Sequence, residues 1–242
     1  MDSRAHHIVP YGSDRIPPQM DKAEEFALSL PRGHSRDIGR PGAPVAAIQM
    51  TQARPLRLSD LRHPFALPPV AQDLAHADTQ LACLRGHLIK LCGLWAKPKT
   101  AFVETYFDAV QGHVNRNEAA LTDRIGALAG LVEPTHWCFA APMPLPRAHL
   151  MLPFGTPPIQ VEMLFRDRDG LVVVALSQGS RTARQTRELE ALETAGVRIV
   201  HLAPQTPSAD LLNALGSDFT SFTDGIDLPD SPFHGMGITA PA

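Results

Sequence analysis

The sequence predicts an α/β fold in which a mixed β-sheet is flanked by helices. Two apolar segments with strand patterns, Ile159 to Phe165 and Leu171 to Leu176, are separated by a polar turn at residues 166–170, which is typical of a β-hairpin. A helical pattern follows and ends at Gly196, directly before a third strand pattern from Val197 to Leu202. Strands joined by a crossover helix pair in parallel, so we expect one parallel pair beside the antiparallel hairpin.

The elements before this unit are read from the apolar spacing. Apolar residues recur in steps of three and four from Leu74 to Trp95, which predicts a helix with a heptad seam. This seam has two interpretations: a dimerising or partner-binding helix, or a helix that docks on the core of its own domain. Thr100 is expected to cap a second helix that extends to about Gln111.

A third helix is predicted to begin at Asn117 and to end before Pro134. After Pro134 the spacing of apolar residues changes from the helical period of 3.6 towards the strand period of 2. Trp137 to Leu145 is therefore interpreted as the first strand of the sheet. Its prolines, Pro142 and Pro144, place it at an edge or end it early because proline donates no backbone hydrogen bond. The helix after the hairpin is expected to be capped by Ser180 or Thr182.

We expect three regions along the chain: a proline-rich, largely irregular arm at residues 1–70, a helical region at 71–116, and an α/β domain with a C-terminal tail at 117–242. Residues 1–70 contain ten of the 23 prolines. Such composition indicates an extended or disordered arm, or an arm of which parts strap onto the folded domain. In the tail, Phe219, Phe222 and Phe233 indicate either a docking peptide or a cover for an open sheet edge.

Charge separates the two parts of the chain. Residues 1–99 carry 13 basic and 9 acidic side chains, whereas residues 100–242 carry 9 arginines, 16 acids and no lysine. Because phosphate neutralisation requires clustered positive charge, this composition argues against a strongly basic nucleic-acid-binding domain. Three scattered cysteines and the lack of a long apolar run favour a reduced, cytoplasmic protein without a membrane span.

The order of the predicted elements resembles the PD-(D/E)XK nuclease-like superfamily. The residue pattern of three segments carries the same resemblance: Glu162 to Phe165, Leu171 to Gly179 and Leu189 to Val200. The resemblance covers about 85 residues and implies a restriction-endonuclease-like αβββαβ core. It also implies magnesium-dependent cleavage of DNA, with an acid on the second strand and a Glu-x-Lys pair on the third. Glu162 matches the first acid.

The Glu-x-Lys pair has no counterpart, because Ala175 and Ser177, or Val174 and Leu176, stand at its positions. In a catalytic interpretation, Glu162, Glu188, Gln178 and Arg181 would form the site, and Glu162 with Glu118 would hold the metal. Arg181, Arg184 and Arg187 recur every three residues and are candidates for binding nucleic-acid phosphate. Alternatively, the helix acids and arginines form a solvated face with an Arg184–Glu188 pair.

Three functions remain open. The first is a non-catalytic relative of these nucleases that binds a protein or nucleic acid and requires no cofactor. The second is a magnesium-dependent DNA endonuclease whose metal ligands have migrated. The third is a helical interaction or assembly protein that uses residues 74–95 to form a homodimer or to bind a partner.

Overall fold

A mixed four-stranded sheet forms the centre of the molecule. The computed structural model describes residues 7–12, 35–37, 46–50, 55–61, 76–93, 96–126, 132–150, 158–176, 181–203 and 205–224. The sheet has the order β4-β5-β6-β7, with β4 (Leu145–Leu150), β5 (Ile159–Arg166), β6 (Leu171–Leu176) and β7 (Arg198–Leu202). The first two pairs are antiparallel and β6 pairs with β7 in parallel, which confirms the mixed sheet.

Local sequence explains the hairpin and the helix that follows it. The Asp167 carboxylate accepts hydrogen bonds from the backbone N–H groups of Asp169 and Gly170 at 2.9 and 2.8 Å, and this closes the turn between β5 and β6. Thr182 caps α5 (Ala183–Thr194) by accepting from the N–H of Gln185. Gly196 follows with φ +84°, a backbone conformation that glycine adopts without strain. The expected cap and end of this helix are confirmed.

The heptad seam lies in the chain's own core. Leu81, Leu84 and Leu88 of α2 (Ala77–Cys92) are at most 2% exposed; Leu74 and Trp95 lie outside the described residues. No described helix is both long and apolar enough to cross a membrane.

The second helix begins earlier than expected. It is α3 (Lys97–Arg116), with Pro98 in its first turn, so the expectation that Thr100 caps it was wrong. Proline fits there because the first N–H groups of a helix have no partner within it. The third helix, α4 (Glu118–Ile125), begins where expected and buries Leu121.

The strand expected at Trp137 to Leu145 was wrong. Residues Pro134–Ala140 form the 3-10 helix η4, and β4 begins only at Leu145. Trp137, Cys138 and Phe139 are all buried. A 3-10 helix has three residues per turn, so successive side chains point in different directions, and they are buried because α2, α3, α4 and η1 pack around η4. The chain enters the sheet after Pro142 and Pro144.

The described parts of residues 1–70 pack against the folded domain. This corresponds to the second interpretation of the arm, in which parts of it pack on the domain. They form a small sheet, β1-β3-β2, from β1 (His7–Tyr11), β2 (Ser35–Asp37) and β3 (Ala46–Met50), and the 3-10 helix η1 (Leu58–Leu61). Tyr11 and Leu58 are fully buried. The N–H of Gly12 donates to the carbonyl of Pro146 at 2.8 Å, so β1 is joined to β4.

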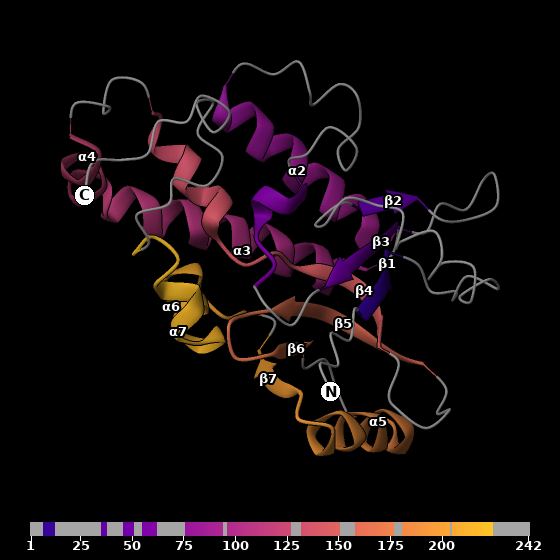
Figure 1. Cartoon of the computed structure of the whole chain (residues 1–242). Helices are drawn as coiled ribbons and strands as arrows, with labels where there is room; N and C mark the ends of the chain where they lie inside the picture. Colours follow the sequence, from indigo (N-terminus) through magenta and orange to yellow (C-terminus); the bar gives the residue numbers. More distant parts are fainter. Residues whose placement is uncertain are drawn as a thin grey trace, which may run out of the picture.

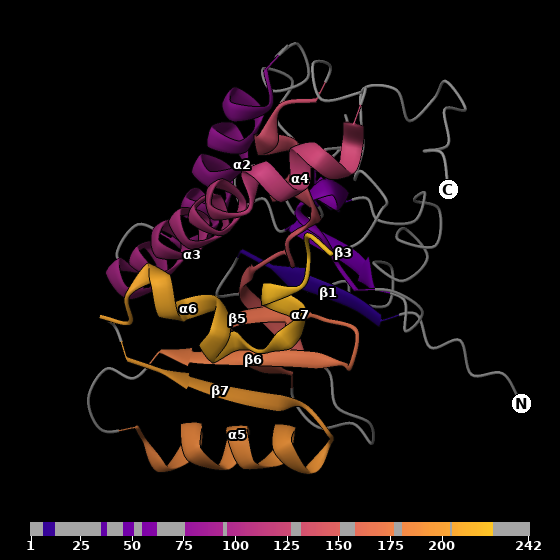
Figure 2. The same ribbon diagram turned by 90° about the vertical axis from the view of Figure 1, so that its left-hand side faces the viewer.

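Helices lie on both sides of the main sheet. Figures 1 and 2 show α3, α6 (Ser208–Leu215) and α7 (Ser217–Thr220) on one side of β6 and β7, and α5 on the other. The Phe165 ring lies 5.4 Å from Tyr106 of α3 and 5.0 Å from Phe219 of α7, measured between centroids. Phe219 and Phe222 are therefore part of the core, while Phe233 lies outside the described residues.

We expect Phe165→Ala to lower the free energy of unfolding by about 3–5 kcal/mol, because it leaves a cavity between the sheet, α3 and α7. Urea denaturation followed by circular dichroism measures this change. Leu189→Ala is the matched control. Because Leu189 of α5 is only half-buried, we expect this variant to lower the free energy of unfolding by less than about 2 kcal/mol. Equal losses from both variants would contradict the central position of Phe165.

Candidate functional site

A pocket lies where α5 covers the sheet. It is a cavity of about 150 Å³ with walls from β5, β6, α5 and the residues that precede α5. Its polar lining side chains are Gln160, Glu162, Arg181, Gln185 and Glu188. Three of the four residues expected to form the site, Glu162, Arg181 and Glu188, therefore line one cavity; the fourth, Gln178, lies outside the described residues.

Glu162 reaches the pocket because of strand alternation. Ile159, Val161, Met163 and Phe165 of β5 are buried, whereas Gln160 is exposed and Glu162 half-buried. One carboxylate oxygen of Glu162, Oε2, accepts a hydrogen bond from the backbone N–H of Leu176 at 2.8 Å. This bond crosses from β5 to the end of β6 and fixes the orientation of the side chain.

A short row of side chains crosses the sheet beside Glu162. The pairing of Met163 with Val174 places Glu162 opposite Ala175, and Ala175 pairs in turn with His201 of β7. Directly opposed residues on adjacent strands share a face and lie roughly 4.5–5.5 Å apart at Cβ. The small Ala175 side chain between two longer ones helps to form the hollow.

Arg181 closes one end of this row. Its Nη2 donates to Nδ1 of His201 at 2.7 Å, and both side chains are exposed. Because guanidinium has donors only, the imidazole must accept at Nδ1. The contact joins the start of α5 to β7, a link that sequence spacing alone did not reveal.

The polar residues of α5 are already engaged with one another. The Gln185 side chain accepts from the N–H of Thr182 at 2.9 Å and completes a capping box. Glu188 binds Nε of Arg184 at 2.7 Å, and this hydrogen bond raises the pKa of Arg184. Arg187 donates to the carbonyl of Ala183 at 3.2 Å. The expected Arg184–Glu188 pair is confirmed, and the arginines have three different partners instead of one shared anion-binding position.

The described residues do not fit the magnesium site that the resemblance implies. Glu118 begins α4, which packs on α3 and η4, and it is not among the residues that line the pocket. Opposite Glu162 stands the methyl group of Ala175, where a second carboxylate is needed. Within the described ranges, no three His, Cys, Asp or Glu side chains gather closely enough to hold a metal ion.

Comparisons with family models, curated proteins and solved structures gave no match to this chain. The functional argument therefore depends on the pocket itself, and on the order and pairing of the strands that form it.

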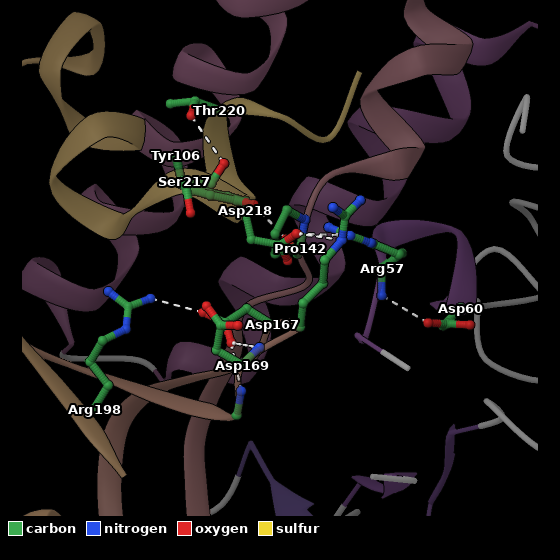
Figure 3. Close-up of polar contacts among 12 residues, drawn as sticks. Arg57, Asp60, Tyr106, Pro142, Asp167, Asp169, Arg198, Ser217, Asp218 and Thr220 are labelled. Atoms are coloured by element: carbon green, nitrogen blue, oxygen red, sulfur yellow. Dashed lines mark hydrogen bonds and ion pairs between the residues drawn. The ribbon is translucent and has the colours of Figure 1, made fainter. Parts of the chain in front are cut away.

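A second polar cluster lies at the turn of the β5–β6 hairpin, beside α7 (Figure 3). Asp218 of α7 is 6% exposed; it accepts a hydrogen bond from Arg57 at 3.3 Å and forms an ion pair with Arg168 at 3.1 Å. Beside it, Arg198 binds Asp167 at 2.8 Å. The cluster joins the segment before η1, the hairpin, β7 and α7, so its role is to hold these elements together.

Sequence reasoning missed this cluster. Arg57 stands in the proline-rich region and Asp218 in the tail, 161 positions apart, and nothing in the spacing relates them. The Asp218–Arg168 contact depends on the position of α7, a short helix that the sequence did not predict. Only the buried Phe219 next to Asp218 offered a signal that this part of the tail packs inward.

Replacing Asp218 with asparagine tests the cluster. Because Arg57 would lose its charged partner in a buried position, we expect the free energy of unfolding to fall by about 3 kcal/mol. Asp108→Asn breaks the exposed Arg85–Asp108 pair and serves as the control, with an expected change of less than about 1 kcal/mol. Urea titrations of both variants supply the measurement, and a loss for Asp218→Asn no larger than the control's would contradict this assignment.

The register beside Glu162 predicts a gain of function. Ala175→Glu places a second carboxylate opposite Glu162, and we expect it to bind Mn²⁺ at least about tenfold more tightly than the unmodified chain, since carboxylate count sets affinity for hard cations. Titration followed by electron paramagnetic resonance measures free Mn²⁺. Ala175→Gln has the same size without the charge and should show no gain; an equal gain in both variants, or in neither, contradicts the register.

Proposed function

We propose that this chain is a non-catalytic relative of the PD-(D/E)XK nucleases that binds a protein partner at the pocket between α5 and the sheet. The observation that carries the proposal is the pairing of Met163 with Val174, because continuing this register by one residue sets Glu162 opposite Ala175. A position that would hold the second metal-binding acid carries a methyl group, while Glu162 remains fixed beside a cavity.

The arrangement of elements supports the relationship. Helix α3 lies on one side of an antiparallel meander, β4 to β6, and α5 lies on the other side before β7, which pairs in parallel with β6. An αβββαβ core has this order of strands and crossover helix, and the likeness supports the proposal; α4 and η4 stand between α3 and β4 in this chain. The acid of the second strand, Glu162, lies where its carboxylate accepts from the end of the third strand.

The chemistry of the lining residues supports binding without cleavage. Metal-assisted hydrolysis requires a bound cation that lowers the pKa of water, and a lysine or another group that handles protons. Residues 100–242 contain no lysine. Arg181, a cationic residue of the pocket lining, donates to His201, and a guanidinium keeps its protons throughout the accessible pH range.

Electrostatics favour a protein partner over nucleic acid. Residues 100–242 carry 16 acids against 9 arginines, and such a balance repels a phosphate backbone. Of the arginines on and before α5, Arg184 is neutralised by Glu188. The pocket lining contains two acidic side chains, Glu162 and Glu188, beside apolar residues.

Two alternatives have specific observations behind them. A magnesium-dependent endonuclease is favoured by the presence of Glu162 and Glu188 in the lining of one cavity. A helical assembly protein is favoured by the heptad pattern, but Leu81, Leu84 and Leu88 are buried within the chain, so an interface there would have to use the other faces of α2.

A plasmid-nicking assay with Mg²⁺ and with Mn²⁺ tests the proposal. We expect the unmodified chain to cleave no more DNA than Glu162→Gln, because neither has the second acid. Duplex binding followed by fluorescence anisotropy at low and physiological salt completes the test, and weak, salt-abolished binding is expected.

Cleavage that disappears in Glu162→Gln would overturn the proposal in favour of the endonuclease. Tight duplex binding that persists at physiological salt, without cleavage, would overturn the choice of a protein partner.

A further inference from the structure

We infer that the pocket receives one cationic side chain, lysine or arginine, of the partner protein. This inference rests on the proposed function and specifies the group that is recognised. It follows from three properties of the pocket: an acceptor without a partner among the described residues, apolar groups in the lining and a small volume.

The acceptor is the second carboxylate oxygen of Glu162. Oε2 is occupied by the N–H of Leu176, and within the described residues Oε1 has no hydrogen-bond or ionic partner. A half-buried carboxylate loses hydration without full compensation, and a cation that approaches it restores this loss through a charge-assisted hydrogen bond. Glu188 of α5 lines the same cavity, and its charge is balanced by Arg184, so Glu162 is the acid that remains for a ligand.

The walls suit an aliphatic stem. Val173, Ala175 and Leu189 line the cavity together with these acids. Lysine and arginine bury their methylene groups along apolar surface while their charged ends stay at polar groups. Such a lining matches a chain of methylenes that ends at Glu162.

The volume limits the occupant to about one side chain. A cavity of about 150 Å³ holds a benzene-sized group, whereas sites for nucleotides and other drug-sized ligands range from about 300 to 1,000 Å³. Arg181 stands at the rim with its guanidinium on His201. In that position it can pair with an acidic residue that flanks the inserted cation.

The test uses ¹⁵N-labelled full chain titrated with capped single residues. The probes are the N-acetyl methylamides of lysine, arginine and norleucine; norleucine has an apolar stem but no charge. We expect lysine and arginine to shift the amide signals of Val173 to Leu176 with dissociation constants about tenfold below that of norleucine, the usual magnitude for a hydrogen bond to a charged group.

Two variants assign the effect to Glu162. Glu162→Gln keeps an oxygen for the Leu176 N–H but removes the charge, and it should abolish the preference for lysine over norleucine. Glu193→Gln removes the same charge from an exposed residue of α5 that does not line the pocket, so it should keep the preference. Thermal melts verify that both variants fold.

Equal affinity for norleucine and lysine, a preference that survives in Glu162→Gln, or no shift with any probe would each overturn the inference. Deoxycytidine monophosphate that shifts the same amides more strongly than lysine would also overturn it and indicate recognition of a nucleobase. These outcomes are separate from the proposed function, which fails only through DNA cleavage or salt-resistant duplex binding.

Discussion

The packing of Phe165 against Tyr106 and Phe219 is the constraint on which the candidate site depends. Because side chains alternate along a strand, burying Phe165 and Met163 on the α3 side turns Glu162 to the α5 side. A shift of one residue in β5 would exchange the two sets and place a carboxylate among aromatic rings. The core thus selects the strand register, and the register in turn selects which residues can meet in the pocket.

Charged contacts on the two sides of the sheet have different consequences. On the α7 side, Asp218 is buried and compensated by two arginines, and such a cluster stabilises one arrangement of distant segments because an unpaired buried charge is costly. On the α5 side, the Arg184–Glu188 pair is largely exposed, and exposed pairs contribute little. The α5 side therefore offers exposed groups that can exchange partners with a ligand.

The sheet from β5 to β7 and the capped helix between the last two strands were predictable, because hairpin turn, N-cap and terminal glycine are all local signals. The strand expected at Trp137 to Leu145 failed because three consecutive buried residues satisfy a tight helix as well as a strand. Similarly, the packing of Tyr11 and Leu58 depends on partners far along the chain. In the site, Glu162, Arg181 and Glu188 were identified together from the nuclease-like pattern, but the Arg181–His201 contact requires knowledge that β7 lies beside β6.

The central proposal is that Glu162 lines a pocket that binds no divalent metal ion. A crystal structure of the unmodified chain soaked in MnCl₂, with data collected for manganese anomalous scattering, tests this claim most directly. The account predicts no anomalous peak within coordination distance of Glu162, about 2.0–2.6 Å from its oxygens. A peak bound jointly by Glu162 and Glu188 would contradict it.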